Sequence, residues 1–140
     1  MYSKSRPLPF LNGKYEDKIY TEQEIKRIRK NVRMWTRPYS FSSKYYHVTE
    51  KENLESILKV GLLPNEIDGC IFMTKTISKL DDYTKLYNIN EPVVLEINSL
   101  VLKVKSFRQS FANDNSIDDV AYLEVIKPEA IKVLEEEKIY

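Results

Sequence analysis

The chain contains one histidine, His47, and its surroundings are the first place where chemistry is expected. Residues 44–49 are rich in aromatic and β-branched types, which predicts a strand. Alternation along a strand puts His47 and Thr49 on one face and Tyr46 and Val48 on the other. A lone histidine on a strand is most often structural, so the interpretation of His47 as a binding residue depends on its neighbours.

A tyrosine and two carboxylates further along the chain fall on other predicted elements. Tyr83 falls on the apolar stripe of a predicted helix, so it either belongs to a core or forms the wall of a pocket. Asp119 precedes a predicted strand at 120–126, and Glu124 lies within that strand on the opposite face.

The elements that must position these residues follow from capping signals and periodicity. Thr21 with Glu24 forms a capping box that predicts a helix to about residue 35, and Thr49 with Glu52 predicts a second helix that ends at Gly61. Ser78 is expected to cap a third helix, over 78–87. The remaining prediction is strands at 71–74, 93–97, 100–104, 120–126 and 130–134, with a polar loop at 106–118. This order of elements predicts an α+β fold.

Charge divides the 140-residue chain, although its net charge is only +1. Residues 1–43 carry ten basic and four acidic side chains, and residues 44–140 carry the acidic excess. We therefore predict one compact unit with a basic N-terminal arm and helix (1–43) ahead of the main domain (44–140). The basic helix either contacts a nucleic acid or is simply a solvated face. The residues that would contact a nucleic acid are Lys26, Arg29, Lys30 and Arg33.

Composition excludes several classes of protein. Apolar runs are far shorter than the ~20 residues of a membrane span, and the N-terminus lacks the apolar stretch of a signal peptide. One cysteine, Cys70, excludes an internal disulfide framework, and with one histidine it leaves no Cys/His zinc site. We expect a cytoplasmic location, no metal and no membrane partner. Frequent Lys, Ile, Asn and Tyr hint at an AT-rich bacterial or phage genome, where a toxin or a phage–host conflict factor would fit.

Three segments together resemble the ADP-ribosyltransferases of the diphtheria-toxin and poly(ADP-ribose) polymerase branch, including the DNA-targeting toxins. The first, Tyr46-His47-Val48-Thr49 with a short helix and Gly61-Leu62, is similar to the family's H-G-[ST]…G-L pattern. The second, Ile71-Phe72-Met73 followed by Ser78-Lys79 and Tyr83, looks like G-I-Y-F-A…S-K-S-A-x-Y. The third, Asp119-Val120-Ala121-Tyr122 followed by Pro128-Glu129-Ala130-Ile131, resembles the toxins' E-V-L-V…P-E-x-I. The resemblance covers roughly residues 44–134 and implies a split antiparallel or mixed β-sheet, with the N-terminal helix as an addition.

The resemblance also implies roles in binding NAD, the substrate that supplies ADP-ribose. His47 would orient a ribose, the Val48 backbone and Thr49 would hold the carboxamide, and Tyr83 would stack on nicotinamide. Asp119 would stabilise the cationic transition state electrostatically. The implied binding set is His47, Val48, Thr49, Phe72, Ser78 and Tyr83, and the implied catalytic set is His47, Tyr83 and Asp119.

The implied function is mono-ADP-ribosyl transfer, a glycosyltransferase reaction, from NAD to a nucleic acid or protein acceptor. Two departures bear on it: Val48 replaces the family's glycine, and Asp119 replaces its catalytic glutamate with a side chain one methylene shorter. A shift of ~1 Å in a catalytic group can cost a hundredfold in rate, so Glu124 remains a rival carboxylate. The alternatives are an inert module that binds NAD-derived nucleotides or a protein partner, an RNA 2′-phosphotransferase of the same fold, and an unrelated α+β interaction domain.

Overall fold

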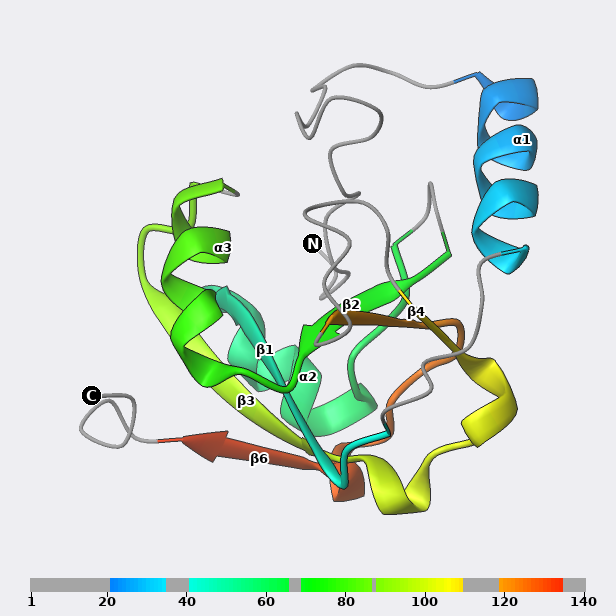
Figure 1. Ribbon diagram of the computed structural model, residues 1–140. Coiled ribbons are helices and arrows are strands. Elements are labelled where there is room, and N and C mark those ends of the chain that lie inside the picture. The colour runs from blue at the N-terminus through cyan, green and yellow to red at the C-terminus, as the bar shows by residue number, and fades with distance from the viewer. Residues whose placement is uncertain (1–20, 35–40, 66–68, 87, 110–118, 135–140) are drawn as a thin grey trace.

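The computed structural model describes residues 21–34, 41–65, 69–86, 88–109 and 119–134. In this part of the chain, three α-helices and six strands form an α+β fold, as predicted from the order of elements (Figure 1). The helices are α1 (Glu22–Arg33), α2 (Leu54–Val60) and α3 (Leu80–Leu86). The strands are β1 (Lys44–Glu50), β2 (Ile71–Thr74), β3 (Pro92–Asn98), β4 (Phe107–Gln109), β5 (Asp119–Tyr122) and β6 (Ile131–Leu134).

The six strands form one sheet in the order β4-β5-β2-β1-β3-β6, and every neighbouring pair is antiparallel. β1 pairs with β3 along its whole length, from Lys44 opposite Asn98 to Glu50 opposite Pro92. Between β1 and β2, in contrast, the described register is one pair, Tyr46 opposite Thr74. The sheet therefore has a seam, which separates β4-β5-β2 from β1-β3-β6.

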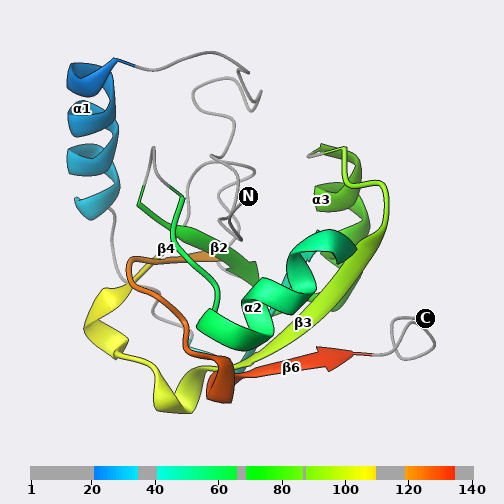
Figure 2. The same ribbon diagram turned by 180° about the vertical axis from the view of Figure 1, so that it is seen from behind.

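The helices cover the two faces of the sheet unequally (Figures 1 and 2). On one face, Ile57 of α2 packs in the main core, which also contains Tyr45 of β1. On the opposite face, Leu80 of α3 packs with Val48 and Val94 in a second cluster. Val32 of α1 packs with Cys70 and Ala121 in a third cluster. Because Ala121 alternates with core residues of β5, α1 lies on the same face of the sheet as α3.

The predicted first helix is confirmed, together with its cap. The Glu24 amide donates to Thr21 Oγ1 at 3.1 Å, and the Thr21 amide donates to Glu24 Oε1 at 2.9 Å. This reciprocal pair satisfies two of the free donors at the start of α1. Gly61 also ends α2 as predicted, with φ of +93°, where a side chain would be strained.

Other local predictions were wrong for physical reasons. Residues 100–104 are not a strand but lie in two 3₁₀ turns, Ser99–Val101 and Val104–Ser106, because the chain must turn between β3 and β4. The predicted loop at 106–118 begins instead with β4, and residues 110–118 lie outside the described part. Thr49 does not cap a helix, since the 3₁₀ turn that precedes α2 begins after Glu50 without a side-chain cap.

Candidate functional site

The most unusual side chain in the sheet is the buried carboxylate of Asp119, which is only 4% exposed. The Tyr83 hydroxyl donates a hydrogen bond to its Oδ2. Lys79 Nζ lies 3.6 Å from its Oδ1. A buried charge is tolerated when it is paired and hydrogen-bonded, and here one hydroxyl and one ammonium group supply both. Asp119, Tyr83 and Lys79 are called the Asp119 cluster below.

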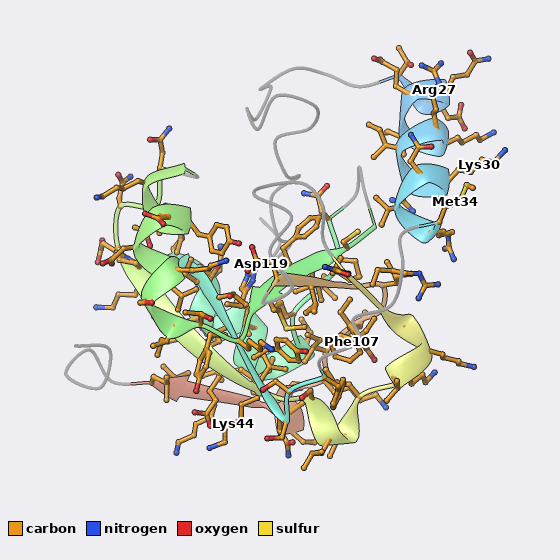
Figure 3. All side chains as sticks on the ribbon, viewed as in Figure 1. Arg27, Lys30, Met34, Lys44, Phe107 and Asp119 are labelled. Carbon is orange, nitrogen blue, oxygen red and sulfur yellow. The ribbon has the colours of Figure 1, made fainter. Side chains whose placement is uncertain are left out.

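Secondary structure brings this cluster together from two parts of the chain. Asp119 is the first residue of β5, as predicted, and it lies opposite Thr74 at the end of β2. A 3₁₀ turn, Ile77–Lys79, follows β2 directly and returns the chain over the same face of the sheet. The Thr74 hydroxyl accepts from the Thr76 amide at 3.2 Å, which helps to hold the start of this return. α3 then carries Tyr83 to the carboxylate, and Figure 3 shows Asp119 between α3 and α1.

His47 makes a different contact, at the seam. Its side chain is buried in β1, and Nδ1 lies 2.7 Å from the carbonyl oxygen of Phe72 in β2. Since a carbonyl only accepts, this contact assigns the proton to Nδ1 and leaves Nε2 of the neutral ring as an acceptor. Burial lowers the pKa of His47, and the bond to the Phe72 carbonyl opposes that change only in part. The ring is therefore poised to accept a hydrogen bond from a hydroxyl or amide.

The structure brings two pairs of the predicted site residues together, and the pairs lie on different sides of the sheet. Tyr83 meets Asp119 on the α3 face, and His47 meets Phe72 at the seam. By strand alternation His47 belongs to the α2 face, because Val48 packs under α3. Phe72 lies two residues before Thr74, roughly 7 Å along β2 from the strand position opposite Asp119. A ligand that contacts both His47 and Asp119 must therefore lie across the seam.

The other predicted binding residues have varied surroundings. The Val48 side chain is buried in the cluster under α3, which leaves its backbone for a binding role. Thr49 is buried, and its hydroxyl accepts from Asn53 Nδ2 at 3.3 Å. Phe72 offers its carbonyl to His47 and packs its ring against the cluster under α1. Ser78 is exposed on the 3₁₀ turn before α3 and does not cap that helix.

The rival carboxylate, Glu124, lies elsewhere. It follows the end of β5 and is not deep within the strand as predicted, since β5 ends at Tyr122. Its carboxylate accepts from the Ser106 hydroxyl and from Lys103 Nζ, the latter at 3.1 Å. The Ser106 hydrogen bond and then Lys103 lower the pKa of Glu124. Glu124 thus links the end of β5 to the connection between β3 and β4 at the surface.

The basic helix presents its charges to solvent, as predicted. The four residues singled out in α1 are exposed: Lys26, Arg29, Lys30 and Arg33. Arg108 of β4 donates from Nε to the Arg33 carbonyl at 3.2 Å, which ties the end of α1 to the sheet edge. The helix that carries the exposed basic face is therefore attached to the sheet, and it lies on the same side of the sheet as the Asp119 cluster (Figure 3).

Lys79 is the site residue to which sequence reasoning gave no role. It was matched within the second motif, but nothing in its spacing marked it as the partner of a carboxylate 40 positions later.

In the described ranges, no group of three His, Cys, Asp or Glu side chains could hold a metal ion. Among the described helices, none is both long and apolar enough to cross a membrane.

No protein-family model matches the chain, and a search of the curated proteins finds no match.

Proposed function

We propose that this protein is a mono-ADP-ribosyltransferase that moves ADP-ribose from NAD to a macromolecular acceptor. The observation that carries the proposal is the hydrogen bond between Tyr83 and Asp119. These residues were assigned to one site from two separate sequence motifs, and they lie 36 positions apart. Their direct contact supports the resemblance in a way that neither motif does alone.

The seam gives the second line of support, because the resemblance implies a split sheet. The described register between β1 and β2 is one pair, so the strand edge beyond Tyr46 is outside that ladder. His47 lies at the seam with Nε2 as an acceptor, which would suit a ribose hydroxyl. The backbone at Val48 is placed along the same edge, where it can hold a carboxamide.

Asp119 would act electrostatically in this reaction. As the bond between nicotinamide and ribose breaks, positive charge develops on the ribose, and a carboxylate fixed nearby stabilises it. Tyr83 and Lys79 hold the carboxylate in place, and Tyr83 can offer one ring face to nicotinamide while the other packs against the core. The acceptor fits a nucleic acid, because exposed basic residues line α1 on the same side of the sheet. A protein acceptor is the alternative.

A second candidate is favoured by the burial of Asp119. Its carboxylate is almost closed off and already engaged by two side chains, and it is shorter than the glutamate of the family. An inert module that binds NAD-derived nucleotides or a protein partner needs no free carboxylate. The two functions therefore differ in one measurable property, the release of nicotinamide.

The test measures nicotinamide release from NAD beside calorimetric binding of NAD and ADP-ribose. Asp119→Ala is expected to abolish release while nucleotide affinity is largely kept, as for a residue used mainly in the transition state. Glu124→Ala is the matched control, since it removes a carboxylate outside the site, and its release should equal that of the unmodified protein. Asp119→Glu restores the family's side-chain length and should raise the rate.

The outcomes separate the candidates. Nucleotide binding without release, with DNA, RNA or protein acceptors present, would leave the inert binder as the function. Loss of release in Glu124→Ala alone would mean that the catalytic carboxylate is misassigned. A protein that neither binds the nucleotides nor releases nicotinamide would end both proposals. For the acceptor, binding of DNA or RNA should weaken steeply with salt, and the change Lys30→Gln should reduce the salt slope by about one.

A further inference from the structure

The connection between β3 and β4 exposes three large aliphatic side chains within five residues. Leu100 is 72% exposed, Val101 is 65% exposed and Val104 is 55% exposed. They lie on the 3₁₀ turns Ser99–Val101 and Val104–Ser106. Both ribbon views show this connection looping out at the periphery of the molecule (Figures 1 and 2). Contiguous apolar patches on a protein surface mark contact sites, and three such side chains so close in sequence are a candidate for one.

The fold holds these side chains outward. Leu102, between the two turns, packs against the main core. At one end of the connection the buried Ser99 hydroxyl donates to the Ser42 carbonyl, and at the other the buried Ser106 hydroxyl donates to Glu124. The Lys103 amide donates to the Tyr122 hydroxyl at 3.1 Å. Because these contacts hold both ends and the middle of the connection, the three aliphatic side chains cannot turn into the core.

The chemistry of this surface fits lipid better than protein. Lys103 and Lys105 are exposed between and beside the aliphatic residues, and Glu124 partly offsets the charge of Lys103. Protein interfaces are enriched in aromatic residues, Met and Arg, and they are depleted in Lys. Aliphatic side chains that enter the acyl boundary, with lysines at the headgroup level, are typical of a protein that binds an anionic membrane from one side.

We propose that Leu100, Val101 and Val104, with Lys103 and Lys105, form a peripheral contact with an anionic lipid surface. This proposal differs from the expectation of no membrane partner, which rested on the absence of a spanning segment. A surface contact needs no span, and it is independent of the proposed transferase activity. It would hold the protein at a membrane through the connection that runs from the end of β3, beside the start of β6, to β4.

The experiment is sedimentation of the full chain with phosphatidylcholine vesicles, with and without phosphatidylserine. The chain should bind the anionic vesicles and bind the neutral ones weakly or not at all. The triple change Leu100→Ser, Val101→Ser and Val104→Ser should weaken binding at least about tenfold. Lys105→Gln should weaken it about fivefold, the effect of one charge next to an anionic surface.

The matched control is another exposed Leu and Val, in α2. Leu58 and Val60 are 48% and 51% exposed and flank Lys59, so the double change Leu58→Ser and Val60→Ser alters the same chemistry elsewhere. It should leave vesicle binding unchanged, and thermal unfolding should show that both variants fold. Equal binding to both vesicle types, or equal loss in the control, would overturn the proposal. So would a concentration-dependent dimer that the triple change abolishes, because the patch would then bind a second copy.

Discussion

The Asp119 cluster makes a quantitative prediction about stability that does not depend on any function. Tyr83→Phe removes one hydroxyl and keeps the ring against Leu80 and Val48. Asp119 Oδ2 then loses the hydrogen bond from that hydroxyl, in a site with almost no access to water. Lys79 remains 3.6 Å from Oδ1, with about a quarter of its own side chain exposed, so it compensates only in part.

The magnitude follows from the charge on the acceptor. A hydrogen bond to a charged group contributes about 1.5–3 kcal/mol to stability, so we expect Tyr83→Phe to lower the free energy of unfolding by about 2 kcal/mol. In a chain of this length that corresponds to a fall in melting temperature of roughly 6 °C. Urea unfolding followed by far-ultraviolet circular dichroism measures it, with the slope against urea expected to stay constant.

A matched change isolates the contribution of charge. The Tyr45 hydroxyl is also buried, but its partner is the neutral Ser42 amide, at 3.1 Å. Tyr45→Phe should therefore cost about 1 kcal/mol, half of the expected cost at Tyr83. A double-mutant cycle of Tyr83→Phe with Asp119→Ala should give a coupling energy of about 1–2 kcal/mol. A cost at Tyr83 below about 0.5 kcal/mol, or a coupling energy near zero, would refute the reasoning.

Four further predictions concern the seam and the local backbone. The pKa of His47 lies below its ordinary value of 6.5 because of burial, so the unfolded chain binds the proton more readily. Stability from this group should be complete above that value and fall as pH drops from 6.5 toward the folded pKa, and unfolding at a series of pH values should show the fall flattened in His47→Asn. Gly61→Ala places a methyl group against the Ile126 carbonyl and should cost more than about 2 kcal/mol by urea unfolding. Gly69→Ala, also at positive φ, places its methyl group 3.8 Å from Arg29 Cγ, an ordinary contact distance, and should cost only about 1 kcal/mol. Thr21→Ala removes one side of the capping box and should cost about 1 kcal/mol, with a loss of helical circular dichroism.

Sequence reasoning succeeded where the determining interaction is local. The capping box at Thr21 is complete within four residues, and the end of α2 at Gly61 depends on one backbone conformation. It failed where the path of the chain between distant elements determines the local structure. Leu100 and Val101 look like strand residues, but the turn toward β4 exposes them, and the polar segment Phe107–Gln109 becomes a strand because β5 is available to pair with it.

The candidate site was predicted as a set of residues, and the contacts within it were not. Asp119 was expected at the start of a strand and lies there, but its buried pairing with Lys79 and Tyr83 depends on the turn after β2. The position of His47 at a seam also follows from long-range pairing, since the register of β1 with β3 and β2 cannot be deduced from either strand alone.

The seam has a consequence for how the protein unfolds. Backbone hydrogen bonds make β1-β3-β6 continuous and β4-β5-β2 continuous, while the two groups of strands are joined by one register pair. On the α3 side, Tyr83 connects a helix packed on β1 and β3 to Asp119 in β5. Between the strands, His47 connects β1 to β2. Native-state amide exchange should therefore find that the two groups of strands open less cooperatively once these two side-chain links are removed, with α2 and the main core beneath it as the remaining connection.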